Sequence, residues 1–568
     1  MSAHPWEHSY PEPARWDAPL ETSQVTTILD EAVAKFADRP AISFMGMRAT
    51  YGQLHTLVAR AAAGFQKLGV KPGVHVGLYL PNTPHYPIAF FGILAAGGTI
   101  VNYSPLDAVD VLAHKIHDSD TQILVTLDIP QLAAQTEAMA KIAPLRTIVL
   151  GNLTSDLGAF PRFTDVGDST AASPEATRIG FADLLANDGT YVKHPFGDPA
   201  EEIAVVQYTG GTTGLPKGAI LTHANLTAAT NQYFETTKVT PPLLIEGVER
   251  AILVLPLFHI YALTSVMLLS IKYGSELSLH PRFDAAAIVD DLVKNKTTKF
   301  YGVPTMYTAL VNYPGIGEMD FSALKYCASG GAPLPVEILH KFRELTGISI
   351  SEGWGMTETS PSGTFTPVRG TRKDGSCGIP VPHCVIRIID VGDPTKTVPL
   401  GERGEIAIKG PNVMKGYWKN AAATAESFTP DGYFRTGDVA FMDDDGFIFI
   451  VDRIKDMLLC GGFNVYPRNI EEAIYTHPGV NEVCVIGIKD EYRGETPKAF
   501  VVLKAGAPEF SLDELKEFLK DKLGKHEMVA QLEFRETLPK TAVGKLQKTV
   551  LIAEEAAKTP ASKTGVGT

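Results

Sequence analysis

Hydrophobic and polar positions vary along this chain in a pattern that predicts helices and short buried strands in alternation. Apolar residues recur at helical spacing over residues 25–36 and 51–68, and the helix expected over 84–96 is apolar on every side. Short apolar runs predict strands at residues 74–80, 123–126, 147–150, 202–208, 251–255, 299–304 and 324–329. Because strands and helices alternate, we expect parallel βαβ units with buried sheets and an α/β fold class.

The pattern changes twice towards the end of the chain. From residue 385 it consists of short strands and turns, which indicates a smaller β-rich piece. A compact α+β unit begins near Asp452 and includes a capping box at Ser511 and Glu514. We therefore predict four segments, which are an N-terminal extension (1–24), a large domain (25–454), a small domain (455–553) and a disordered tail (554–568).

Composition narrows the classes of function. The chain has 51 basic and 64 acidic residues and a net charge of -13, so it lacks the general basic surface of a nucleic-acid-binding protein. Its five cysteines include no CxxC pair and are odd in number, which argues against a disulfide framework or a zinc site. A reducing, cytoplasmic location fits this cysteine usage best.

One apolar stretch is long enough to cross a bilayer. Residues 251–271 contain no Asp, Glu, Lys or Arg. Pro256 and His259 interrupt the stretch, and its two halves read as a buried strand and a buried helix. We therefore expect no membrane span, and residues 1–20 hold no apolar run of the kind found in a signal peptide.

The strongest chemical motif is residues 208–218, which follow a predicted strand. They contain four glycines, three threonines and Lys217. Glycines let backbone N–H groups converge on an anion, and the hydroxyls and the lysine add donors and positive charge. This composition predicts a phosphate-binding loop, with a plain Gly-rich turn as the alternative. It is not a Walker A loop, because Lys217 stands between Pro216 and Gly218.

Two further segments could bind the rest of a nucleotide. In residues 351–359, Trp354 lies between two glycines, so its flat face could lie open for stacking on a purine, and Glu358 offers oxygen to Mg²⁺. The alternative is a packed Trp and a solvated Glu. In residues 431–438, Asp438 could accept both ribose hydroxyls, or it could cap its own turn.

Two motifs lie at the predicted domain boundary and beyond it. Residues 452–467 place charged residues before Gly461 and Gly462, which suits either a plain linker or a hinge with a Gly loop. In residues 538–545, Lys545 follows a glycine on a polar loop, so it could reach another domain or simply be solvated.

Taken together, these motifs resemble the adenylate-forming superfamily of acyl-CoA synthetases, firefly luciferase and nonribosomal peptide adenylation domains. The resemblance covers about residues 25–551, includes residues 255–263, and is closest to bacterial fatty-acyl-CoA ligases. It implies a large N-terminal domain of two βαβ subdomains plus a β-barrel-like subdomain. It also implies a small, mobile α+β C-terminal domain that rotates about a hinge at Lys455.

The resemblance implies a two-step reaction with ATP, Mg²⁺ and coenzyme A. A carboxylic acid attacks the α-phosphate of ATP to form acyl-AMP, and the thiol of coenzyme A then displaces AMP. Lys545 would bridge the α-phosphate and the carboxylate, and Glu358 would bind Mg²⁺. The remaining nucleotide- and CoA-binding residues would be Thr209, Gly210, Gly211, Thr212, Thr213, Gly214, Lys217, Gly330, Gly331, Ala332, Glu352, Gly353, Trp354, Gly355, Met356, Thr357, Asp438, Arg453, Lys455, Gly461, Gly462 and Phe463.

The acid is less well defined. His259 would lie near the reacting carboxylate, in a gating or packing role rather than a chemical one, and residues 261–271 could line a hydrophobic acyl tunnel. A medium- or long-chain fatty acid is preferred, while aromatic acids and dicarboxylates stay open. The chain departs from fatty-acyl ligases after Lys545, where it keeps only Lys548 in place of several arginines.

Alternatives remain at this stage. An acyl-AMP ligase or an enzyme that adenylates amino or aryl acids would share every motif, and a catalytically silent nucleotide- or lipid-binding protein could share the fold. The expected partners are the acid, ATP and coenzyme A, with no nucleic acid. Peripheral membrane association and a homodimer stay open.

Overall fold

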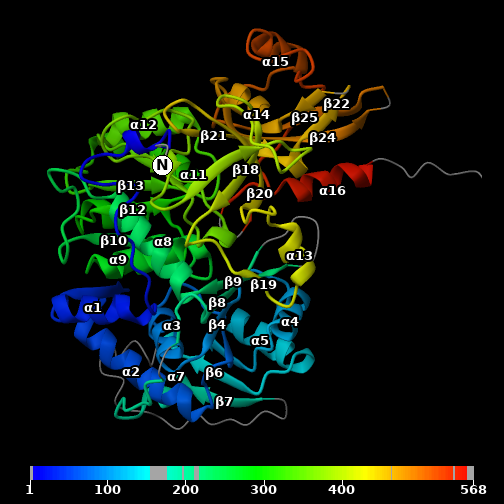
Figure 1. Ribbon diagram of the computed structural model, residues 1–568. Coiled ribbons are helices and arrows are strands. Elements are labelled where there is room, and N and C mark those ends of the chain that lie inside the picture. The colour runs from blue at the N-terminus through cyan, green and yellow to red at the C-terminus, as the bar shows by residue number, and fades with distance from the viewer. Residues whose placement is uncertain are drawn as a thin grey trace, which may run out of the picture.

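A computed structural model describes residues 4–153, 176–194, 197–209, 216–461, 463–490, 492–541 and 544–558. One large hydrophobic core draws its residues from Trp6 to Ile448, and a second core draws its residues from Leu458 to Val529. The molecule therefore has a large N-terminal part and a small C-terminal part, which lies at the top of Figure 1. This arrangement and its mixture of helices and strands confirm the predicted α/β fold class.

The first sheet has eight strands in the order β19-β9-β8-β4-β3-β5-β6-β7. Its strands are β3 (His75–Leu78), β4 (Thr99–Asn102), β5 (Ile123–Leu127), β6 (Thr147–Gly151), β7 (Thr177–Gly180), β8 (Ile203–Tyr208), β9 (Gly218–Thr222) and β19 (Gly416–Tyr417). Strands β3 to β8 run parallel, and β9 and β19 add antiparallel pairs at one edge. Strands β3, β4 and β5 are buried along their whole length, as expected where helices cover both faces of a parallel sheet.

The second sheet has seven strands in the order β14-β13-β12-β10-β11-β1-β2. Its strands are β1 (Pro40–Phe44), β2 (Met47–Thr50), β10 (Arg250–Leu253), β11 (Glu276–Leu279), β12 (Lys299–Gly302), β13 (Tyr326–Ser329) and β14 (Ile350–Glu352). All neighbours are parallel except β1 and β2. Because β12, β13 and β14 end at the same edge, the loops that follow them meet there, where α/β proteins commonly bind ligands.

Helices cover the sheets of the large part. They are α1 (Thr26–Phe36), α2 (Tyr51–Lys67), α3 (His85–Ala95), α4 (Val109–Asp118), α5 (Pro130–Ile142), α7 (Phe181–Leu185), α8 (His223–Thr236), α9 (Leu269–Lys272), α10 (Ala285–Val293), α11 (Pro304–Val311), α12 (Val336–Thr346) and α13 (Ala421–Glu426). The helix expected over 261–271 begins as a π-helix, Tyr261–Leu268, and continues into α9. Among the described residues, none of the helices combines the length and apolar character needed to cross a bilayer.

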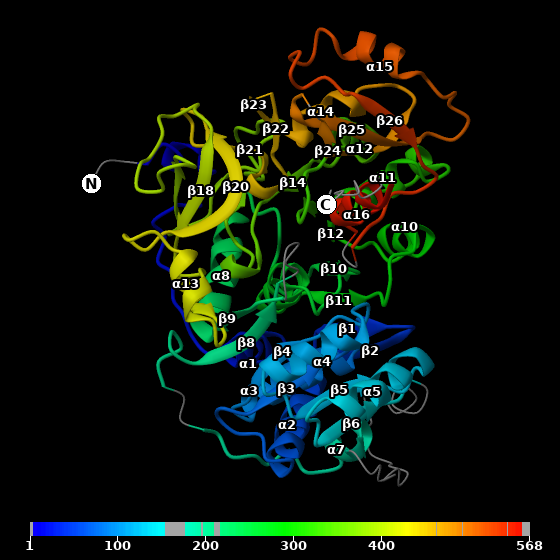
Figure 2. The same ribbon diagram turned by 90° about the vertical axis from the view of Figure 1, so that its right-hand side faces the viewer.

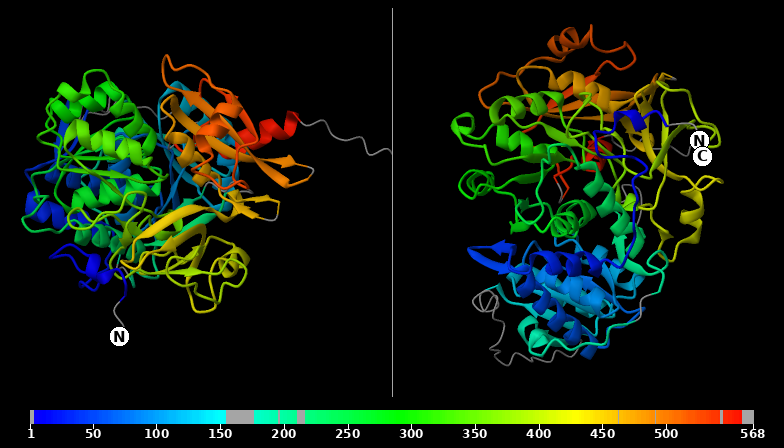
Figure 3. Two further views of the ribbon diagram at one scale, coloured as in Figure 1. Left: turned by 90° about the horizontal axis from the view of Figure 1, so that it is seen from above. Right: turned by 60° about the vertical axis from the view of Figure 1, so that its left-hand side comes forward.

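The β-rich piece is a four-stranded antiparallel sheet in the order β17-β18-β20-β21, with a two-stranded sheet beside it. The strands are β15 (Thr364–Phe365), β16 (Ile379–Pro380), β17 (Val385–Ile389), β18 (Gly404–Lys409), β20 (Phe434–Met442) and β21 (Ile448–Arg453). The N-terminal segment packs on this piece and follows the outside of the molecule (Figure 3). The Tyr10 hydroxyl donates to the Pro380 carbonyl at 2.6 Å, and Trp16 Nε1 donates to the Cys384 carbonyl at 3.0 Å.

The C-terminal part is a five-stranded sheet with three helices. Its elements are β22 (Leu458–Cys460), β23 (Phe463–Val465), α14 (Pro467–Tyr475), β24 (Val480–Asp490), β25 (Gly494–Leu503), α15 (Leu512–Leu519), β26 (Gln531–Phe534) and α16 (Lys548–Lys558). Figure 2 shows this part above the second sheet, with the first sheet at the opposite end of the molecule.

The predicted start of the disordered tail at Glu554 is wrong, because α16 continues to Lys558. Ion pairs hold the end of this helix on the sheet: Arg535 contacts Glu554 at 2.8 Å, and Lys498 contacts Glu555 at 2.9 Å. Leu551 is buried on the inner side of the helix. Residues 559–568 lie outside the described part of the chain.

Candidate active site

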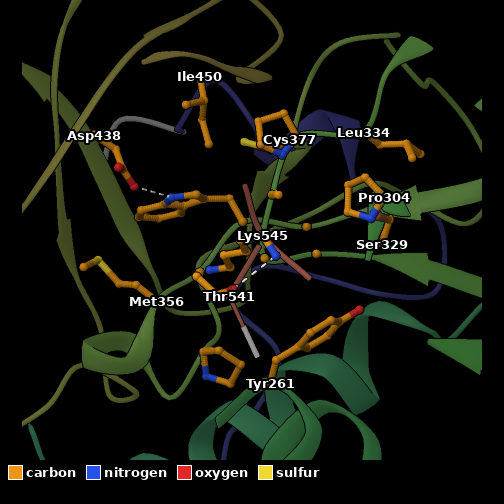
Figure 4. Close-up of a pocket in the computed structure, with 18 of the residues that line it drawn as sticks. Tyr261, Pro304, Ser329, Leu334, Met356, Cys377, Asp438, Ile450, Thr541 and Lys545 are labelled. Carbon is orange, nitrogen blue, oxygen red and sulfur yellow. Dashed lines mark hydrogen bonds between the residues drawn. The ribbon is translucent and has the colours of Figure 1, made fainter. Parts of the chain in front are cut away.

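A cavity of about 1,760 Å³ lies where the two parts of the molecule meet. Its lining includes the loops after β12, β13 and β14, the strand pair β20 and β21, and the loop before α16. Figure 4 shows Lys545 projecting into this cavity, with Asp438 to one side, Ser329 to the other and Tyr261 below it. Segments that lie more than two hundred residues apart in the sequence thus share one site.

Asp438 is held in a fixed orientation at one wall. Trp354 Nε1 donates to its Oδ2 at 2.7 Å, and Arg453 Nε lies 3.0 Å from its Oδ1. Asp438 stands opposite Arg453 in the register of β20 and β21, and it is only 4% exposed. It therefore does not cap its own turn, and its carboxylate is a buried, charge-paired acceptor that faces the cavity.

Trp354 is packed as the alternative interpretation expects, although it also lines the cavity. The residue is 8% exposed, and a Cβ built on Gly363 would lie 2.5 Å from the indole ring. A Cβ on Gly355 would lie 1.3 Å from the Pro361 carbonyl oxygen. These glycines therefore allow the backbone and the indole to pack closely, and the ring presents its N–H to Asp438.

Glu358 is buried at 6% exposure, so it is not the solvated residue of the alternative interpretation. The Tyr417 hydroxyl donates to Glu358 Oε1 at 2.9 Å, and burial raises the pKa of Glu358. The described residues contain no cluster of three or more His, Cys, Asp or Glu side chains able to enclose a metal. A single carboxylate of this kind fits Mg²⁺, which proteins commonly hold through one or two carboxylates together with substrate phosphates and water.

Lys545 is the cation at the centre of the cavity. A Cβ built on Gly331 would lie 3.2 Å from Lys545 Cε, so the absence of a side chain at Gly331 makes room for the lysine. Thr541 orders the loop, because its hydroxyl accepts from the Lys545 N–H at 3.2 Å and its own N–H donates to the Lys545 carbonyl at 2.7 Å. Burial and the charge of Arg453 lower the pKa of Lys545 to about 8.

His259 lines the cavity where the π-helix begins, next to the part of the lining that we call the apolar branch. Its Nδ1 accepts from the Tyr261 N–H at 3.2 Å. Burial, together with the charge of Lys545, lowers its pKa to about 3, so the imidazole is neutral at pH 7. The apolar branch beyond it is lined by Tyr233, Thr237, Tyr261, Ser265, Leu269, Tyr301 and Tyr326.

Glu352 lies at the opposite end of the cavity, at the end of β14. Its Oε2 accepts from the Leu334 N–H at 3.3 Å, and burial raises its pKa to about 7. The positive charge of Arg468, which comes from α14 of the C-terminal part, counteracts this rise. The two parts of the molecule are therefore electrostatically coupled at this end of the site.

The cavity brings together most of the predicted residues. Its lining includes Thr209, His259, Gly330, Gly331, Ala332, Glu352, Gly353, Trp354, Gly355, Met356, Thr357, Glu358, Asp438, Arg453, Lys455 and Lys545. Lys217, Gly461 and Phe463 are not in this lining. Phe463 is 58% exposed, with its ring against His526. Gly210, Gly211, Thr212, Thr213, Gly214 and Gly462 lie outside the described residues.

The sequence analysis did not identify Tyr417 or Thr541. It noted Lys548 only as the basic residue that remains where fatty-acyl ligases have several arginines. Lys548 Nζ lies 3.1 Å from Glu471 Oε1, and both side chains are less than one-fifth exposed. Lys548 is therefore a partner in a partly buried ion pair that fastens the start of α16 to α14. In the sequence, Lys548 stood out only by its spacing from Lys545. That spacing does not reveal its partner Glu471, which lies 77 residues away.

We expect Lys548→Gln to destabilise the protein by about 1–2 kcal/mol, because it leaves the partly buried Glu471 carboxylate without its cation. Urea unfolding followed by circular dichroism measures this effect. Lys294→Gln is the matched control, since Lys294 and Asp290 form an exposed pair that contributes little. Equal unfolding midpoints for the two variants would contradict the role assigned to Lys548.

Comparisons with known proteins identify the family. Residues 29–418 match the AMP-binding enzyme family, and residues 469–545 match the AMP-binding enzyme C-terminal domain. The chain belongs to the AMP-binding enzyme family, and the resemblance inferred from the motifs is confirmed.

Three similar proteins place the chain more narrowly. A long-chain-fatty-acid–CoA ligase of Bacillus subtilis is 38% identical over 98% of this chain and 99% of its own length. A feruloyl-CoA synthase of Amycolatopsis sp is 35% identical over 89% of this chain and 94% of its own. The crystal structure of ATP-bound MatB from Rhodopseudomonas palustris matches with a TM-score of 0.82 and 27% identity, over 94% of this chain and 100% of that one. The prediction of an AMP-forming ligase that uses ATP and coenzyme A is confirmed.

Proposed function

We propose that this ligase acts on a long-chain fatty acid and that Lys545 drives its first half-reaction. The observation that carries the proposal is the position of Lys545, which reaches from the C-terminal part to Gly331 between Asp438 and the apolar branch. Seven curated relatives named long-chain-fatty-acid–CoA ligase, at 36–38% identity, would be a weaker basis alone, because such names do not identify which side chains act on the substrate.

A free carboxylate is a poor acyl donor, because its oxygen does not leave; activation replaces that oxygen with AMP as the leaving group. Attack of the carboxylate on the α-phosphate joins the acid to AMP and releases pyrophosphate, and negative charge builds on the phosphate oxygens as it proceeds. Lys545 supplies positive charge at that point, in a cavity where few waters would screen it. The family resemblance and its place in the lining support this role.

The remaining residues would hold the nucleotide. We propose that Asp438 accepts the ribose hydroxyls, with Arg453 beside it, and that the loops at Gly330–Ala332 and Glu352–Thr357 frame the adenine. Residues 209–214 and Lys217 would hold the β- and γ-phosphates. Mg²⁺, held by Glu358, would neutralise phosphate charge when bound.

We propose that the second half-reaction follows a rotation of the small domain about Lys455. The thiol of coenzyme A attacks the acyl carbonyl carbon of acyl-AMP, the thiol proton passes to solvent, and AMP leaves with the bonding electron pair. Gly461 and Phe463 support this proposal because they are not in the cavity lining and Phe463 is exposed. Rotation would withdraw Lys545 from the cavity and bring the loop with Gly461 and Phe463 to it.

The apolar branch supports the acid class. It includes residues of the π-helix, which directly follows His259, and the charge of Lys545 acts on His259. We infer that the carboxylate end of an acid would lie next to Lys545. We propose that His259, being neutral, helps to shape this entrance rather than to transfer a proton.

A panel of acids tests the substrate class. Acyl-CoA formation would be measured with acetate, octanoate, palmitate, benzoate, pimelate and ferulate at equal concentration. Palmitate is expected to give the highest kcat/KM. Comparison of AMP release with and without coenzyme A would identify an acyl-AMP ligase, which forms no thioester.

An aromatic acid is the second candidate. Four tyrosines, Tyr233, Tyr261, Tyr301 and Tyr326, line the apolar branch, and one relative is named feruloyl-CoA synthase. Aromatic walls pack well against a planar ring. Ferulate preferred over palmitate by more than ten-fold in the same panel would establish this alternative.

The first half-reaction should slow at alkaline pH. Because the pKa of Lys545 is lowered to about 8, its charged form is lost as the pH rises through that value. We expect pyrophosphate release from the free acid to fall above about pH 8, while thioester formation from supplied acyl-AMP lacks this fall. Lys545→Arg, which stays charged, should remove the alkaline decline in whatever activity it retains. A decline at the same pH in this variant would contradict the assignment.

A further inference from the structure

Tyr417 connects two groups that lie far apart in the sequence. Its hydroxyl donates to Glu358 Oε1 at 2.9 Å, and the Lys217 ammonium lies 5.1 Å from the centre of its ring. Lys217 closes the predicted phosphate loop, and Glu358 is the buried carboxylate that fits Mg²⁺. One side chain therefore touches both the lysine and the carboxylate expected at the phosphate end of ATP.

The backbone fixes Tyr417 in this place. Strand β19 pairs with β9 immediately after the phosphate loop, with Tyr417 opposite Ala219, and the Trp418 N–H donates to the Gly218 carbonyl at 2.7 Å. On the other side, the Met414 N–H donates to the Glu358 carbonyl at 2.8 Å. Residues 414–418 thus join the base of the phosphate loop to the segment that carries Glu358.

We propose that Tyr417 is a positioning residue for the magnesium–triphosphate end of ATP: its hydroxyl orients Glu358, and its ring holds Lys217 near the phosphates. This inference rests on the proposed function, in which Glu358 binds Mg²⁺ and Lys217 binds phosphate. Hydrogen bonds to a charged group and cation–π contacts both restrict side-chain orientation before the ligand arrives. Preorganisation of this kind increases affinity because less conformational freedom is lost on binding.

Tyr417→Phe separates the two contacts, because it removes the hydroxyl and keeps the ring. Isothermal titration calorimetry would measure binding of ATP at several Mg²⁺ concentrations, and of AMP, in the absence of acid. We expect about ten-fold weaker binding of ATP with Mg²⁺, in line with the loss of a hydrogen bond to a charged group, and less than a two-fold change for AMP. Tyr417→Leu should weaken ATP binding further, since Lys217 then also loses the ring.

Two controls distinguish positioning from packing. Tyr51→Phe removes another buried hydroxyl, which donates to the Ser275 carbonyl at 2.7 Å and lies outside the cavity lining, and it should leave ATP binding unchanged. In a Glu358→Gln background, Tyr417→Phe should cause no further loss of ATP affinity, because it acts through that carboxylate.

The proposal fails if Tyr417→Phe leaves ATP affinity unchanged, weakens ATP and AMP equally, or adds its full effect to that of Glu358→Gln. Failure of the proposed function would look different. In that case the unmodified protein would not form acyl-CoA from ATP, acid and coenzyme A. This result does not depend on the ATP affinities of the variants.

Discussion

Lys545→Ala is expected to abolish adenylation of the free acid while leaving thioester formation from supplied acyl-AMP largely intact. In the first half-reaction the charge of Lys545 stabilises the α-phosphate while it is attacked. In the second half-reaction the attack is on the acyl carbon, so no bond to phosphorus forms and this charge is not needed. Removal of one preorganised electrostatic contact of this kind costs about a hundred-fold to a thousand-fold in rate. The expected loss in the first half-reaction is therefore at least about a hundred-fold.

Separate assays of the two half-reactions measure this effect. Acid-dependent exchange of pyrophosphate into ATP reports the first, and thioester formation from synthetic acyl-AMP and coenzyme A reports the second. Lys558→Ala is the matched control, since Lys558 belongs to the same domain and pairs with Glu533 and Glu555 at the end of α16. Equal losses in both half-reactions of Lys545→Ala would show that the lysine has a structural role instead.

Asp438→Ala should impair both half-reactions, because AMP is bound throughout the cycle. The substitution removes the proposed acceptor of the ribose hydroxyls and leaves the Trp354 N–H and Arg453 without the carboxylate they contact. Loss of one partner of a buried, hydrogen-bonded charge pair typically costs about 2–5 kcal/mol, so AMP affinity should fall by about a hundred-fold.

Asp431 offers the matched control for Asp438. It lies in the same sequence motif but on the surface, where it pairs with Arg387 at 2.7 Å. Asp431→Ala should therefore leave AMP binding within about two-fold of the unmodified protein, as measured by calorimetry. An Asp438→Ala variant that binds AMP normally, or that loses only one half-reaction, would refute the ribose role.

Much of the fold could be predicted from periodicity. Strands β3, β5, β6, β12 and β13 lie within a few residues of their predicted ranges, because each is a short apolar run bounded by turns. The end of the chain was harder to predict. Residues 554–558 resemble a polar tail in composition, and their ion pairs with Arg535, Lys498 and Glu533 hold them against the sheet.

The site could be predicted where the motifs were local. Lys545, Asp438, Glu352 and Glu358 all line the cavity. Each stands in a short sequence motif, and the resemblance to the adenylate-forming superfamily singled it out. Tyr417 could not be found that way, because it lies 59 residues from Glu358 and contacts it only after β19 pairs with β9. The packing of Trp354 could not be predicted from the sequence either, because it depends on the close approach of the backbone at Gly355 and Gly363.

One product analysis tests the central claim most directly. The purified protein would be incubated with ATP, Mg²⁺, palmitate and coenzyme A, and every product would be quantified in the same sample. Our account predicts AMP, pyrophosphate and palmitoyl-CoA in equal amounts, with no AMP formed when palmitate is omitted. Formation of ADP and phosphate, or of AMP without any thioester, would contradict it.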